Sequence, residues 1–156
     1  MEIFVQKLTI LLITLLLSLP ILSKELTCDN ECKKIQTENY LRNIVQIFIK
    51  GSTVKEIDNF LDGLHEEIKY EHQEYEADFD KTKWRKAFIN QLELGSYVSS
   101  PNAKAKILNI IYGKNHAAVE YSYGTLNEDG SWTKGHVKFA LFGFKGGKVS
   151  LVREYW

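Results

Sequence analysis

The sequence predicts an α+β domain in which three helices are followed by an antiparallel sheet. Apolar residues in the first half of the chain recur at three- and four-residue spacing, which is typical of helices with one buried face. In the second half they alternate with polar residues, which is typical of strands with one buried face. With 156 residues, of which 44% are hydrophobic, the chain suits one domain with a sizeable core.

The helical half divides into three helices and one short strand. The apolar spacing predicts a first helix over residues 31–50 and a second helix capped by Ser52 or Thr53, with Glu56 three residues after Thr53 as in a capping box. Residues 68–73 alternate and predict a short strand. A polar, acidic stretch through Asp78 separates this strand from a third helix over residues 81–94.

The remaining chain predicts four strands joined by turns. Residues 104–112 are rich in Ile and Leu, and residues 116–126 alternate cleanly between the two faces. The Asn-Glu-Asp-Gly sequence at 127–130 is a strong hairpin turn, and it leads into long strands over 132–144 and 149–156.

Charge and motif content exclude several classes of protein. Twenty basic and 20 acidic residues give a net charge of zero, whereas a nucleic-acid binder normally carries a basic excess. No two histidines lie at metal spacing on one element, and no phosphate loop or Ser-His-Asp pattern stands out. We therefore expect no nucleic-acid partner, no metal and no cofactor.

An apolar run near the N-terminus predicts export. The run over residues 8–22 is shorter than the roughly 20 apolar residues of a spanning helix. Pro20 near its end supplies a helix break, and Ser23 directly after it supplies a small residue for cleavage. We expect residues 1–23 to be a signal peptide and the mature protein to be secreted or periplasmic, with no membrane contact after cleavage. A retained membrane anchor is the alternative.

Residues 24–32 form a short N-terminal segment that contains both cysteines of the chain. Cys28 and Cys32 are one helical turn apart, and an oxidising compartment would permit a disulfide between them. Whether they are bridged or free stays open at this point, and neither is expected to take part in catalysis.

Residues 33–156 resemble one known superfamily. The order helix–helix–strand–helix–sheet, together with the sequences at 127–130, 142–149 (Phe-Gly-Phe-Lys-Gly-Gly-Lys-Val) and 153–156 (Arg-Glu-Tyr-Trp), is similar to the nuclear transport factor 2-like superfamily, which includes ketosteroid isomerases and SnoaL-like proteins. The resemblance implies a cystatin-like roll: a cone-shaped, curled sheet packed on three helices around an open-ended apolar pocket.

The resemblance also implies which side chains face that pocket. The position that matches an aromatic pocket residue of the isomerases is Trp156, so Val152 and Glu154 share its face by alternation. On the preceding strand the same register turns Val137, Phe139 and Leu141 inward. The expected pocket residues are Tyr40, Ile44, Tyr70, His72, Trp84, Phe88, Tyr121, Tyr123, Phe139 and Trp156.

Departures from the isomerase pattern weaken the case for that reaction. The position that resembles the isomerases' general base is His72, and the two oxyanion-hole positions match Ile44 and Phe139, which cannot donate a hydrogen bond. His72 and Glu154 are the candidate catalytic residues. Glu154 either pairs with His72 or bonds a group on a neighbouring strand, and the second arrangement is favoured.

Three functions fit these observations. The favoured one is an exported binder of a small hydrophobic or amphipathic molecule, because the expected pocket is aromatic and poor in paired catalytic groups. The second is a SnoaL-like isomerase, cyclase or hydrolase with His72 as general base. The third is a structural domain that forms a homodimer through the outer face of its sheet.

Overall fold

The computed structural model describes residues 27–156, so the expected signal peptide lies outside the described residues. Three helices and six strands make up this part of the chain. They are α2 (Asn30–Phe48), α3 (Val54–Asp62), β1 (Lys69–His72), β2 (Ala77–Asp80), α4 (Lys81–Glu93), β3 (Ala103–Tyr112), β4 (His116–Leu126), β5 (Trp132–Lys145) and β6 (Lys148–Glu154). Within residues 27–156, no helix is long and apolar enough to cross a membrane.

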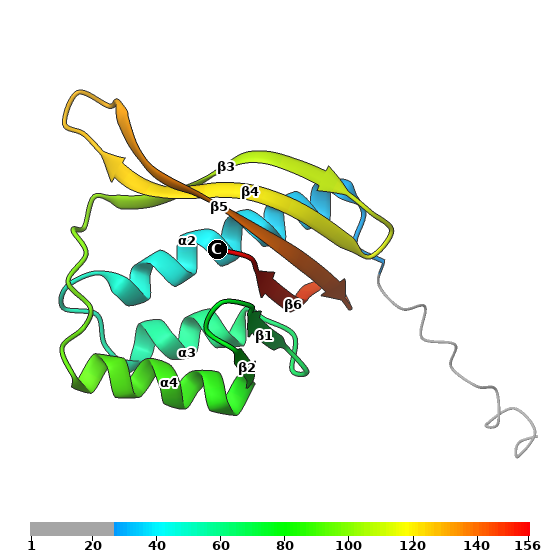
Figure 1. Ribbon diagram of the computed structural model, residues 1–156, viewed down its shortest axis with the longest axis horizontal. Coiled ribbons are helices and arrows are strands. Elements are labelled where there is room, and N and C mark those ends of the chain that lie inside the picture. Colours follow the sequence, from blue (N-terminus) through cyan, green and yellow to red (C-terminus); the bar gives the residue numbers. More distant parts are fainter. Residues whose placement is uncertain (1–26) are drawn as a thin grey trace, which may run out of the picture.

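The six strands form one curled sheet in the order β2-β1-β6-β5-β4-β3. The three helices lie together against one side of this sheet (Figure 1), which confirms the predicted α+β class. All neighbouring strands are antiparallel except β1 and β6, which run parallel, with Tyr70 beside Val152 and His72 beside Glu154. The short strand from the helical half thereby joins the last strand of the chain.

Local signals at the helix N-termini account for where the helices begin. The Asp29 side chain caps α2 by accepting a hydrogen bond from the Cys32 backbone N–H at 2.8 Å. Cys28 and Cys32 form a disulfide that encloses this cap. At α3 the predicted capping box is confirmed. The Thr53 side chain accepts a hydrogen bond from the backbone N–H of Glu56, and the Glu56 side chain accepts one from the backbone N–H of Thr53.

The predicted element list lacks β2. The acidic stretch before α4 contains a four-residue strand in which Ala77 and Phe79 are half-buried while Asp78 and Asp80 are exposed. Asp80 then caps α4 through the Lys83 backbone N–H. Four residues are too few for alternation alone to distinguish a strand from a polar loop.

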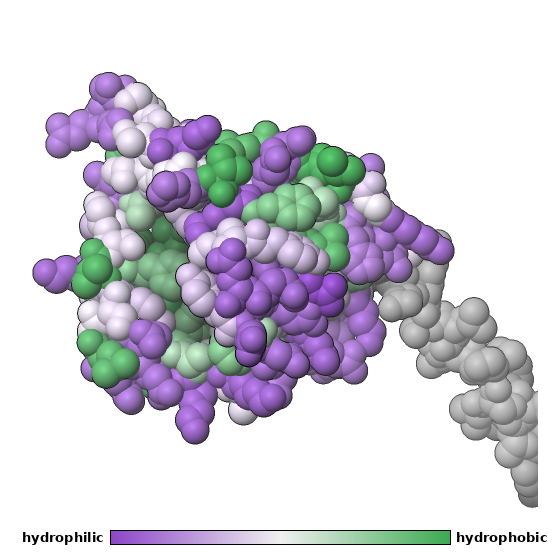
Figure 2. Space-filling model, in the orientation of Figure 1, coloured by the Kyte–Doolittle hydropathy of each residue, from purple (hydrophilic) through white to green (hydrophobic). Residues whose placement is uncertain are grey.

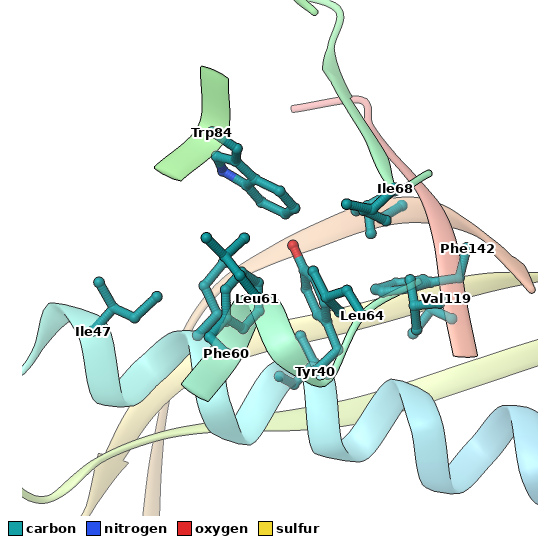
Figure 3. Packing of buried hydrophobic residues seen from close by; sticks show 14 of the residues in the cluster. Tyr40, Ile47, Phe60, Leu61, Leu64, Ile68, Trp84, Val119 and Phe142 are labelled. Atoms are coloured by element: carbon teal, nitrogen blue, oxygen red, sulfur yellow. The ribbon is translucent and has the colours of Figure 1, made fainter. Parts of the chain in front are cut away.

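Aromatic side chains fill the space between the helices and the sheet. Tyr40 stands at the middle of this core (Figure 3), with its ring centroid 5.3 Å from Phe60 and 5.1 Å from Phe142. Trp84 of α4 packs edge-on against Phe60 from the other side. The core therefore joins α2, α3, α4 and β5 in one cluster.

The predicted inward register of β5 is wrong. A regular hairpin would pair Phe139 with Glu154, but Ser150 is an extra residue in β6, and beyond it Ala140 pairs with Glu154. Paired residues share a face of the sheet, so Ala140 and Phe142 lie inward with Glu154 and Val152, and Lys138 follows by alternation along β5. Val137, Phe139 and Leu141 therefore lie on the outer face. Phe139 is accordingly 41% exposed, and its ring contacts Tyr155 outside the pocket.

Two phenylalanines of β5 provide a matched test of this register. Phe142 is fully buried, so Phe142→Ala is expected to lower the free energy of unfolding by about 3–5 kcal/mol. Phe139→Ala on the outer face is expected to cost less than about 1 kcal/mol. Urea unfolding of both variants measures the difference, and equal losses would contradict the register.

Candidate functional site

The parallel pairing of β1 and β6 brings the candidate site residues together. Tyr70 and His72 alternate on the inner face of β1, and Glu154 faces the same way at the end of β6. From β4, Tyr121 is fully buried and Tyr123 partly buried against the same core. The predicted inward placement of these five side chains is confirmed.

Two tyrosine hydroxyls hold the carboxylate of Glu154, which is 3% exposed. The Tyr70 hydroxyl donates to Glu154 Oε2 at 2.7 Å, and the Tyr121 hydroxyl donates to Oε1 at 2.5 Å. A buried carboxylate needs such partners, because it has left its hydration shell behind. Of the two arrangements that the sequence left open for Glu154, hydrogen bonding to neighbouring strands is the one present.

Four tyrosines around this carboxylate retain their protons. Burial is the largest cause that raises the pKa of Tyr40, Tyr70, Tyr121 and Tyr123, and the negative charge of Glu154 raises each of them further. The hydroxyls therefore serve as hydrogen-bond donors and acceptors at neutral pH.

Some buried polar atoms of this cluster have no hydrogen-bond partner within the described residues. They are the Tyr40 hydroxyl, both ring nitrogens of His72 and the indole Nε1 of Trp156. Tyr40 and His72 are each 2% exposed. His72 Nε2 lies 4.0 Å from Glu154 Oε2, beyond hydrogen-bond distance.

His72 is enclosed by aromatic rings at the end of β1. Its ring centroid lies 4.4 Å from that of Tyr75 and 4.6 Å from that of Trp156, which meets it edge-on. Trp156 is half-buried and packs against His72 and Tyr75.

An apolar groove of about 470 Å³ opens beside the cluster. Figure 2 shows a hollow with hydrophobic side chains at its floor, beside the C-terminal residues. Its wall is a row of stacked rings, because Tyr70 stacks on Trp84 at 4.5 Å and Trp84 on Phe88 at 5.5 Å. The lining residues are Phe48, Tyr70, Phe79, Trp84, Ala87, Phe88, Gln91, Ser96, Tyr97, Val98 and Ser99.

The loop that closes one side of the groove is tied to the helices. Ser99 exchanges backbone hydrogen bonds with Phe48 and Lys50 at 2.9 Å each. The Tyr97 hydroxyl donates to the Phe88 carbonyl at 3.0 Å, and burial raises the pKa of Tyr97 to about 12. These hydrogen bonds fix the position of the loop beside the groove.

Tyr70 connects the groove to the polar cluster. Its ring lines the groove while its hydroxyl bonds Glu154. A ligand in the groove would touch the ring of Tyr70, so its polar group can lie close to the cluster. Of the predicted pocket residues, Tyr70, Trp84 and Phe88 line the groove, whereas Ile44 belongs to the packed core.

The corrected register of β5 adds Lys138 to the site. Lys138 pairs with Tyr121 across the sheet, and its Nζ lies over the ring of Trp156. The sequence placed this lysine on the outer face. A bulge in the neighbouring strand has no strong sequence signal, so alternation alone could not find it.

No metal site is found in residues 27–156, where no group of three or more His, Cys, Asp or Glu is placed to hold an ion.

Comparison with solved structures identifies the architecture. An NTF2-like protein from Anabaena variabilis aligns at a TM-score of 0.53 and 17% identity, over 81% of this chain and 90% of that one. The chain has the nuclear transport factor 2-like fold. Comparison of the sequence with protein-family models and with curated proteins gives no match.

Two further structures share this nuclear transport factor 2-like fold. A cystatin-like protein of unknown function from Methylobium petroleophilum aligns at a TM-score of 0.53 and 10% identity, over 83% of this chain and 78% of that one. A protein from Kribbella flavida, provisionally described as a ketosteroid isomerase, aligns at a TM-score of 0.51 and 13% identity, over 83% of this chain and 80% of that one.

The raised tyrosine pKa values predict loss of stability at alkaline pH. Tyr40, Tyr70, Tyr121 and Tyr123 keep their protons in the folded state. Their contribution to the free energy of unfolding is fully present below pH about 10, the pKa of tyrosine in the unfolded chain. It is lost as pH rises above that value, because only the unfolded chain then releases these protons. We expect tyrosinate absorbance to rise partly in step with unfolding followed by circular dichroism. Ionisation of every tyrosine with the fold intact would contradict this.

Proposed function

We propose that this protein binds a small, largely apolar molecule in the aromatic groove, with the molecule's polar group directed toward the Glu154 cluster. The observation that carries this proposal is the ring of Tyr70, which lines the groove while its hydroxyl bonds Glu154. The volume of the groove, about 470 Å³, lies within the range of small-molecule sites. The expectation of an exported protein is part of the same proposal.

The groove chemistry favours apolar ring systems. Stacked and edge-on aromatic contacts stabilise bound rings beyond the area they bury. Four near-parallel rings, Phe79, Tyr70, Trp84 and Phe88, form one wall, with interplanar angles of 18°, 21° and 24° between successive pairs. A flat ligand could extend this stack.

A groove-filling variant tests the proposal. N-phenyl-1-naphthylamine, a neutral fluorescent probe, is expected to bind the native protein with increased emission. Ala87→Phe places a ring inside the groove and should weaken this binding at least about tenfold. Lys86→Phe, at the neighbouring exposed position of α4, is the matched control and should bind as the native protein does. Equal affinity for all three would refute the groove as the site.

Proton transfer by His72 is the second candidate function. It is favoured by the two unpartnered ring nitrogens and by the 4.0 Å separation from Glu154. The carboxylic acid that an isomerase places on the penultimate strand is absent here, because Lys138 and Ala140 occupy the inward positions near Glu154. Tyr40 is the one unpartnered hydroxyl donor in the cluster.

Two His72 variants separate ligand binding from catalysis. If His72 orients a polar group, His72→Gln should keep most of the affinity for 1-naphthaleneacetamide, and His72→Leu should weaken it by about 1–2 kcal/mol. Calorimetric titration measures both affinities, and hydrolysis of 4-nitrophenyl acetate reports general-base activity. Loss of hydrolysis in both variants with unchanged amide binding would establish proton transfer instead.

A further inference from the structure

Lys138 presents a half-buried ammonium group beside the candidate site. It lies on the inner face of β5, opposite Tyr121 of β4. Its Nζ lies over the Trp156 indole and 5.9 Å from the ring centroid of Tyr123. Tyr123 in turn meets Phe48 of the groove edge-on. Along this path the ring of Tyr123 separates the ammonium from the groove lining.

The contacts of Lys138 within the described residues are with aromatic rings, and no carboxylate lies within 4.0 Å of its Nζ. An ammonium group has three N–H donors and prefers oxygen acceptors. Burial lowers the pKa of Lys138, while the more distant charge of Glu154 raises it. The group has thus lost part of its hydration and gained no acceptor in return.

We propose that Lys138 binds the carboxylate of the ligand, so that the ligand is an amphipathic anion with an aromatic or other apolar body. This rests on the proposed function, because the apolar body would occupy the aromatic groove. A ligand carboxylate would supply the acceptor that Lys138 lacks, and hydrogen bonds between ionised groups are the stronger kind.

The alternative of a cationic ligand fits the site less well. Glu154 already accepts one tyrosine hydroxyl on each oxygen, so its charge is partly satisfied. The face of Trp156, where an aromatic ring would attract a cation, is covered by Lys138 itself. A bound cation would have to displace that lysine.

Three compounds with one naphthyl body test the charge preference. They are 1-naphthaleneacetate, the isosteric 1-naphthaleneacetamide, and the cationic 2-(1-naphthyl)ethylamine, each titrated calorimetrically into the full chain. Without a receptor cation the acetate should bind more weakly than the amide, because a carboxylate loses more hydration on burial. We expect the native protein to bind the acetate at least about tenfold more tightly than the amide.

Variants of Lys138 assign this preference to one side chain. Lys138→Met should abolish it and leave the amide affinity within about twofold, whereas Lys138→Arg should retain most of it. Lys134→Met removes the same charge from an exposed position of β5 and should leave the preference unchanged. Thermal unfolding confirms that each variant is folded.

The outcomes distinguish this inference from the function on which it rests. If the acetate binds no more tightly than the amide, or if Lys134→Met and Lys138→Met lose the preference equally, the role of Lys138 is refuted. Tighter binding of the amine would also refute it and would assign recognition to Glu154. Failure of the neutral N-phenyl-1-naphthylamine to bind would instead refute the binding function itself.

Discussion

The buried carboxylate of Glu154 is the constraint on which the rest of the site depends. A charge this far from water must be hydrogen-bonded, and its two partners come from β1 and β4, on either side of the β6–β5 pair. The Tyr70 hydroxyl reaches it because β1 runs parallel to β6. Removal of either strand would leave the carboxylate short of a donor, so the polar cluster and the pairing of these strands in the sheet stabilise each other.

The same tyrosine makes the interior polar on one side and apolar on the other. Tyr70 turns its hydroxyl to Glu154 and its ring face to Trp84, where the aromatic row of the groove begins. A molecule with one polar end and an apolar body matches that division. Because the surrounding tyrosines hold their protons firmly, the cluster is better suited to fixing a polar group than to passing protons along a chain of hydroxyls.

One extra residue in β6 decides which side chains of β5 share the face of Glu154. Ser150 shifts the β5–β6 register by one position, so Glu154 pairs with Ala140 and shares the inner face with Lys138. Phe139 lies on the outer face, where its ring packs against Tyr155. The inner face of β5 therefore presents the ammonium group of Lys138, where the sequence predicted the ring of Phe139.

The helices and the long strands were determined by local signals that the sequence displays by itself, and the resemblance to the superfamily implied the inward faces of β1, β4 and β6. Helical spacing, the Thr53–Glu56 capping box and clean alternation around Tyr121 depend on neighbouring residues. Only the tertiary structure decided the parallel β1–β6 pairing, the partners of Glu154, the aromatic groove and the inward turn of Lys138. These depend on contacts between residues far apart in the chain and on a single-residue bulge, and neither leaves a periodic trace in the sequence.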